Sequence, residues 1–169
     1  MAGDAIGGHV SCSIDRRGEA MEDYGRRVVV DLPFDRALID VVQALHEEGI
    51  HVLSRFDVRD YLKRTLHHDF RRYTLLQAAT PQLTCDALQA DLAVGAILPI
   101  TIAVYELADG ETAVVVSEPF APVLADSGWR ESAPGLARLA DQESDLLARA
   151  MSRLQREAPR YAQAAPGLT

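Results

Sequence analysis

The sequence predicts an α+β fold: a mainly antiparallel sheet of about five strands with helices packed on one face. Three observations favour it. Short β-branched runs alternate with amphipathic helical segments in the order β-α-β-α-β-α-β-β-α. Asp109-Gly110 joins the last two strands as a tight hairpin, which makes that pair antiparallel. A chain of 169 residues that is 48% hydrophobic suits one well-filled core.

The strands are identified by their runs of β-branched and apolar residues. We expect them over residues 26–31, 50–56, 73–79, 96–106 and 112–117. The fourth run is nearly continuous in apolar residues, which is typical of a strand covered on both faces for most of its length. Pro99 cannot donate a hydrogen bond to a neighbouring strand, so it should lie near the start of this strand, at an edge or at a bulge.

The first two helices are bounded by characteristic end residues. Pro33-Phe34-Asp35 opens a helix with apolar residues at the helical spacing. Gly49 ends it, because glycine adopts the left-handed conformation there without penalty. The acids Asp57 and Asp60 suit the first turn of a short helix that reaches about Leu66.

The last two helices frame the most apolar part of the chain. Thr80-Pro81 is a helix start, since a threonine oxygen can accept a first-turn N–H and a proline at the first helical position loses no hydrogen bond. A long helix runs from Pro134 to about Glu157. Its apolar stripe indicates packing against the sheet, or a dimer seam, rather than a cofactor site. The stripe contains Leu136, Leu139, Ala140, Leu146, Leu147, Ala150, Met151 and Leu154.

The two ends of the chain lack periodicity. Residues 1–25 are expected to form a flexible leader, residues 26–157 a single α+β domain and residues 158–169 a tail. His9 and Cys12 in the leader have a ligand-like spacing, but a zinc site needs about four ligands and no partner cluster is visible. The adjacent histidines His67-His68 point in different directions. We therefore predict no metal site.

The composition argues against several classes of function. A net charge of −8 and a pI near 5.0 disfavour general nucleic-acid binding, which needs a surplus of Lys and Arg. No signal peptide and no run of 18 apolar residues is visible, so we expect a cytoplasmic protein without membrane association. The motifs GxGxxG, Walker A, GxSxG and HExxH are absent, and no cofactor is assigned.

A series of short motifs resembles one family. They are Asp31-Leu32-Pro33-Phe34-Asp35, Glu47-Glu48-Gly49-Ile50-His51-Val52-Leu53, Asp57-Val58, Arg72-Tyr73, Pro81, Ala87-Leu88, Ala90-Asp91, Gly95 and Leu98-Pro99. In order and spacing they are similar to the LPFDEA, EEGFGVLTEIDV and GACNPxxAxxALEADPxxGxLLPC motifs of the domain-of-unknown-function 302 family (DUF302), over about residues 28–119. The resemblance implies a fold similar to the TATA-binding-protein-like class, often a homodimer, with no settled activity.

This chain departs from the family pattern at its cysteines. The cysteines of the ACNP and LLPC motifs fall on Ala79 and Ile100, and the asparagine falls on Thr80. A thiolate is the nucleophile or metal ligand in cysteine chemistry, and neither alanine nor isoleucine can replace it. We therefore expect a function without cysteine chemistry at these positions.

The lost cysteines mark a candidate ligand pocket. If Ala79 and Ile100 are neighbours, as the paired family cysteines suggest, the spot is now apolar, and it is either a repacked core or an enlarged pocket. Strand alternation puts Ala79 on one face with Tyr73 and Gln77, and Ile100 in one row with Ile102. The candidate pocket residues are Tyr73, Gln77, Ala79, Thr80, Ile100 and Ile102.

Polar candidates lie nearby. Glu106 ends the row of Ile100 and would suit general acid or base catalysis beside apolar surface, unless it lies past the sheet edge in solvent. Tyr105 is a second candidate. The arginines Arg55, Arg71 and Arg72 could clamp an anion through bidentate hydrogen bonds, or could simply pair with surface carboxylates.

Three functions remain open. The first is a homodimeric module that binds a small, partly apolar ligand or a protein partner between helices and sheet. The second is a small pathway enzyme in which Glu106, Tyr105 or a histidine acts as acid or base in an apolar pocket. The third is a structural paralogue that dimerises with a cysteine-bearing relative.

Overall fold

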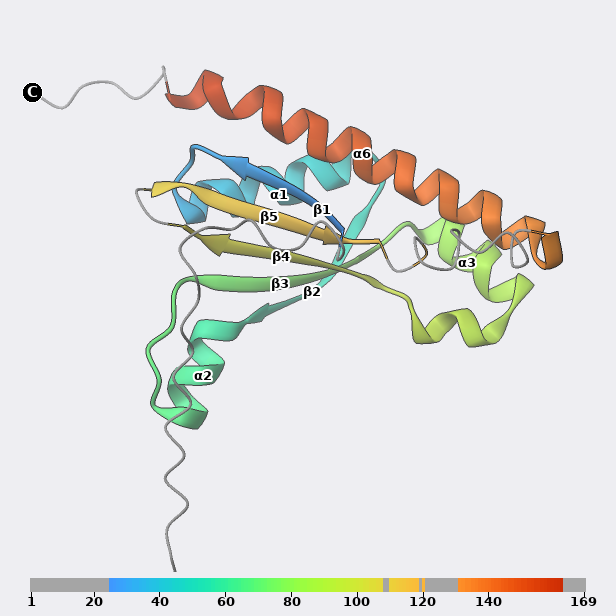
Figure 1. Ribbon diagram of the computed structural model, residues 1–169, viewed down its shortest axis with the longest axis horizontal. Helices are drawn as coiled ribbons and strands as arrows, with labels where there is room; N and C mark the ends of the chain where they lie inside the picture. The colour runs from blue at the N-terminus through green and yellow to red at the C-terminus, as the bar shows by residue number, and fades with distance from the viewer. Residues whose placement is uncertain (1–24, 108–109, 119, 121–130, 163–169) are drawn as a thin grey trace, which may run out of the picture.

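A five-stranded sheet with a long helix across one face forms the body of the protein (Figure 1). The computed structural model describes residues 25–107, 110–118, 120 and 131–162, with side chains up to residue 156. The elements in chain order are β1 (Gly25–Val30), α1 (Phe34–Glu47), β2 (His51–Asp57), α2 (Val58–Leu66), β3 (Tyr73–Ala79), α3 (Pro81–Ala90), the 3-10 helix η2 (Leu92–Ala96), β4 (Ile100–Glu106), β5 (Thr112–Ser117) and α6 (Pro134–Ala162).

The sheet has the order β1-β5-β4-β3-β2, and every neighbouring pair is antiparallel. The predicted fold class and the predicted order of strands and helices are therefore confirmed. β4 lies at the centre between β5 and β3, while β1 and β2 form the two edges. The edge strand β2 is interrupted by a register shift between Val52 and Ser54, which is typical of a β-bulge at a sheet edge.

The main core lies between the sheet and the helices α1 and α6, which cover the same face. Alternate residues of the strands point into it, because side chains alternate along a strand. We call this group the main cluster, and its most deeply buried members are Val30, Val41, Leu45, Ile50, Leu76, Ile100, Ile102, Val104, Val114, Val116, Leu147 and Leu154.

Local chemistry at the helix ends follows the sequence in most places. The Asp57 carboxylate caps α2 by accepting a hydrogen bond from the backbone N–H of Asp60 at 3.0 Å. Gly49 has φ +76° just after α1, and the N–H of Ile50 bonds back to the carbonyl of Leu45. Both predictions are confirmed. Thr80 does precede α3, but its side chain makes no capping hydrogen bond, so the predicted threonine cap is wrong in that detail.

Two boundaries and one burial pattern differ from expectation. β4 begins at Ile100 rather than at residue 96, because η2 and the Leu98-Pro99 peptide intervene. Its side chains alternate between buried and half-buried, so β4 is not covered on both faces. α6 continues to Ala162 instead of ending near Glu157, which makes the first part of the predicted tail helical.

Several expectations lie outside the described residues. They concern residues 1–24 of the predicted leader, which include His9 and Cys12, the turn residue Asp109, and residues 163–169 of the predicted tail. Gly110, the second residue of that turn, is described and has φ +83°, which suits the expected hairpin.

Candidate functional site

A pocket lies beside the main core, where the first half of α6 faces α3. Its walls come from α3, from the segment before β4, from the residue Phe120 after β5, and from α6. We call it the α3–α6 pocket, and it is lined by Leu83, Thr84, Ala87, Leu98, Phe120, Leu136, Leu139 and Glu143. Most of these residues form a second, smaller hydrophobic cluster, which we call the minor cluster.

The pocket is small and opens to solvent. Its cavity volume is about 10 Å³, close to the least that holds one water molecule, whereas its empty space with the open mouth included is about 270 Å³. A ligand that enters the pocket as it stands can therefore place only a small group inside. The remainder of such a ligand would lie against the leucines and the phenylalanine at the mouth.

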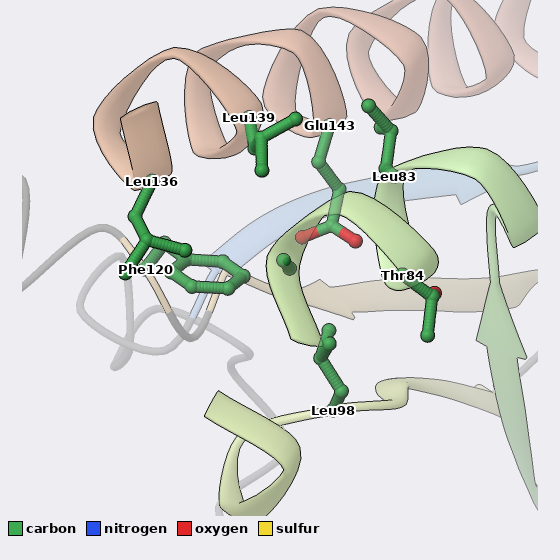
Figure 2. Close-up of a pocket in the computed structure, with 8 residues that line it drawn as sticks. Leu83, Thr84, Leu98, Phe120, Leu136, Leu139 and Glu143 are labelled. Carbon is green, nitrogen blue, oxygen red and sulfur yellow. The ribbon is translucent and has the colours of Figure 1, made fainter. Parts of the chain in front are cut away.

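Among the described residues that line the α3–α6 pocket, Glu143 is the only titratable one. Figure 2 shows its carboxylate pointing from α6 into the space between Phe120 and Thr84. The residue is 7% exposed, and among the described residues nothing donates a hydrogen bond or a counter-charge to it. Burial among apolar side chains raises the pKa of Glu143 to about 7. This carboxyl group therefore exchanges its proton near neutral pH.

The guanidinium that bonds the residue next to Glu143 is paired with another carboxylate. Arg26 on β1 forms an ion pair with Glu118 at 2.9 Å and donates a hydrogen bond to the hydroxyl of Ser144 at 3.0 Å. Ser144 also donates to Glu118, at 3.2 Å. Although Ser144 follows Glu143 directly on α6, the network closes on Glu118 and leaves Glu143 without a positive partner.

The sequence contained a signal for Glu143 that the apolar stripe concealed. Glu143 lies three residues after Ala140 and four before Leu147, which are both buried. At that spacing it shares their face of the helix. A charged residue at a core-facing position of an otherwise apolar stripe is costly, and it indicates a functional or paired group.

The residues predicted for a pocket do not line this one. Tyr73 and Gln77 lie on the sheet face opposite to the main core, and the Gln77 side chain accepts a hydrogen bond from Ser54. Ile100 and Ile102 point into the main cluster and are at most 1% exposed. The structure thus separates the six candidates between two faces of the sheet and the start of α3.

The two positions that hold cysteines in the family motifs lie on neighbouring strands, but their side chains do not share a face of the sheet. Ile100 pairs with Ala78, so strand alternation directs Ala79 to the opposite side. Both residues are buried, Ala79 at 7% and Ile100 at 1% exposure. Thr80 follows at the start of α3 and is half-buried. Ala79 and Ile100 therefore pack on opposite faces of the sheet and do not form one cavity.

Glu106 and Tyr105 end β4 away from the α3–α6 pocket. Glu106 is half-buried, and its backbone N–H donates to the carbonyl of Arg72 at 3.0 Å. Tyr105 stacks on Tyr73 with ring centroids 5.3 Å apart and an interplanar angle of 7°. Burial raises the pKa of Tyr73, and the neighbouring Tyr105 adds to the effect, so Tyr73 stays protonated at neutral pH.

The three candidate clamp arginines have separate surroundings. Arg72 forms an ion pair with Asp35 and lies over the ring of Phe34 at 4.6 Å. Arg71 donates a hydrogen bond to the backbone carbonyl oxygen of Glu106, at 3.3 Å. Arg55 lies exposed on the edge strand β2. Arg72 therefore follows the ion-pairing alternative, and no contact among the described residues joins the three into a clamp.

A second surface feature is the sheet face opposite α1 and α6, which we call the open face. Cross-strand partners share a face, so the row Phe56, Leu75, Ala103 and Val115 crosses it. Phe56 is 45% exposed and lies 5.4 Å from the ring of Tyr61 on α2. α2 itself has no buried residue and extends away from the other helices (Figure 1).

Among the described residues, no group of three or more His, Cys, Asp or Glu side chains is arranged to hold a metal ion. No helix within the same residues is long and apolar enough to cross a membrane.

Comparison with known proteins assigns the fold and the family but no activity. The family model described as "Domain of unknown function DUF302" matches residues 26–154. The crystal structure of an uncharacterized conserved protein DUF302 from Bacillus stearothermophilus is similar, with a TM-score of 0.66 and 25% sequence identity. That similarity covers 78% of this chain and 98% of the other. No curated protein matches the sequence.

Proposed function

Because this chain belongs to the DUF302 family, whose name carries no activity, we propose its function from the geometry: a binding module that takes a small ligand in the α3–α6 pocket without cysteine chemistry. One observation carries the proposal. A carboxylate that is 7% exposed and unpaired among the described residues lies in an otherwise apolar pocket open to solvent. Such a combination of apolar walls and one convergent polar group is typical of ligand sites.

The absence of cysteine chemistry is supported at each cysteine position that is described. The family positions hold Ala79 and Ile100, both buried. Cys85 is a free thiol on the exposed side of α3, and the Gln89 amide lies 3.5 Å from its sulfur. It does not line the α3–α6 pocket.

A pair of substitutions on α3 tests the proposed site. Thr84→Phe places a ring in the pocket, whereas Cys85→Phe places the same ring on the adjacent, exposed position. We expect fragments with a small polar head and an apolar body to raise the melting temperature of the wild type and of Cys85→Phe, but not of Thr84→Phe. Circular dichroism checks that all three proteins are folded. Equal shifts in both variants, or no shift in the wild type with any fragment, would refute the pocket as the binding site.

We also propose that the module is a homodimer formed through the open face. Two observations support this: the exposed aromatic residues Phe56 and Tyr61, and the helix α2, which buries none of its residues within the chain. Aromatic residues are enriched in the centres of protein interfaces. Light scattering on Phe56→Glu is expected to give a monomer, while Ile39→Glu, on an exposed position of α1, stays dimeric. A monomeric wild type would overturn the proposal.

A small enzyme that uses general acid or base catalysis is the second candidate function. It is favoured by the pKa of about 7 at Glu143, which suits proton transfer at neutral pH. Glu143 therefore replaces Glu106 and Tyr105 as the candidate acid or base. A ligand that binds Glu143→Gln but is turned over only by the wild type would favour the enzyme over the binding module.

A further inference from the structure

We propose that the α3–α6 pocket binds the ammonium group of a small primary alkylamine, with Glu143 as its counter-ion and the apolar wall as the surface for its alkyl chain. This inference rests on the proposed function, since it names the ligand class of the same pocket.

The charge of the ligand follows from what surrounds Glu143. Of the eight lining residues that the structure describes, seven are uncharged and none is Lys or Arg. Arg26, which bonds the adjacent Ser144, is held by Glu118. A counter-charge for the carboxylate must therefore come from outside the described residues. The net charge of −8 on the whole chain also favours the approach of a cation over that of an anion.

The size of the head group follows from the small volume of the pocket. Its cavity volume of about 10 Å³ is close to the least that holds one water molecule. An ammonium group is of similar size and is a compact charge with three donors, whereas a guanidinium is a wider planar group. Thr84, which also lines the pocket, offers a hydroxyl oxygen as a second acceptor. A primary ammonium is thus the cationic head group that fits.

The body of the ligand follows from the wall. Leu83, Leu98 and Leu139 line the pocket together with the aromatic ring of Phe120. Figure 2 shows these side chains around the Glu143 carboxylate. A bare metal ion or ammonium ion would leave this apolar surface wet. A short alkyl chain covers it and gains the associated hydrophobic free energy.

The test compares three ligands of equal length and different head groups: butylamine, butanol and butyrate. Binding is measured by NMR titration of the full chain at pH 8, where the amine is still protonated. We expect butylamine to bind at least about tenfold more tightly than butanol, because a charge-assisted hydrogen bond is stronger than a neutral one. Butyrate should bind most weakly of the three.

Two variants with the same change of net charge separate the site from the surface. Glu143→Gln should reduce butylamine affinity to that of butanol, while Asp145→Asn, an exposed position on the same helix, should leave the difference intact. Equal affinities for amine and alcohol in the wild type, or a preference that survives in Glu143→Gln, would overturn the amine inference while the pocket still binds. Absence of binding by any fragment would instead overturn the proposed function.

Discussion

The two halves of α6 pack against different clusters, and each half provides a different environment for one carboxylate. The second half closes the main cluster, and its Arg149 and Arg153 hold Glu48 at 2.7 and 3.0 Å. These hydrogen bonds lower the pKa of Glu48. The first half closes the minor cluster and itself carries Glu143, which has no such partner among the described residues and whose pKa rises to about 7 through burial.

This difference indicates which of the two carboxylates stabilises the fold. Glu48 joins the end of α1 to α6, so its charge is balanced by two guanidinium groups from the helix that it contacts. Glu143 contributes no contact of this kind and weakens the cluster in which it lies, since an unpaired buried charge is unfavourable. Such a cost is typical of residues retained for binding or catalysis rather than for stability.

The largest effect expected from this contrast is at Glu143. Because its pKa rises from 4.5 to about 7 on folding, the folded state favours the protonated form. The stability that results is fully present below pH 4.5 and is lost as the pH rises through about 7, by about 3 kcal/mol in all. Glu143→Gln removes this loss, so it should be more stable than the wild type at pH 8.5 and similar to it at pH 4.5.

Urea denaturation of both proteins across this pH range measures the effect. No other titratable side chain in the described part of the chain lines the pocket, so the difference between the two curves reports on Glu143. Asp145→Asn, at an exposed position, is the control and should run parallel to the wild type. If Glu143→Gln also runs parallel to the wild type, the carboxyl group is not desolvated in solution, and the contrast with Glu48 fails.

Most of the fold could be predicted because its signals are local. β-branched runs identify β3 and β5 over the residues observed, and a single side chain, Asp57, identifies the start of α2. Residue Gly49 marks the end of α1 because its φ of +76° suits glycine. Each of these signals depends on neighbouring residues alone, so no knowledge of the tertiary contacts is needed.

The site was harder to predict because it depends on register and on helix rotation. Ile100 faces Ala78 rather than Ala79, and a shift of one residue in strand pairing moves a side chain to the other face. No local pattern sets that register. Glu143 was missed for a related reason: reading the stripe of α6 for apolar residues alone passes over the charged residue that shares its face. The stretch from Thr80 to Pro99, which carries the last of the DUF302-like motifs, nevertheless contributes to the pocket through Leu83, Thr84, Ala87 and Leu98.

A smaller effect of opposite sign is expected at Glu48. Its pKa is lowered in the folded state, so the stability that it contributes is present above pH 4.5 and is lost as the pH falls through the folded-state pKa. Arg149 is 56% exposed, and solvent therefore screens much of the interaction. Glu48→Gln should lower the free energy of unfolding by about 1 kcal/mol at pH 7 and by little at pH 3. Salt at about 0.5 M should reduce the difference at pH 7.

Glu47→Gln provides the comparison within the same cluster of charges. Glu47 meets only Arg153 in the described ion pairs and is 35% exposed, against 11% for Glu48, so its replacement should cost less. Urea denaturation at pH 7 and pH 3 distinguishes the two variants. If Glu48→Gln were neutral at pH 7, the two ion pairs would only break even against desolvation. The main cluster would then be held by its apolar residues alone, and α6 would no longer have one half that balances charge and one that does not.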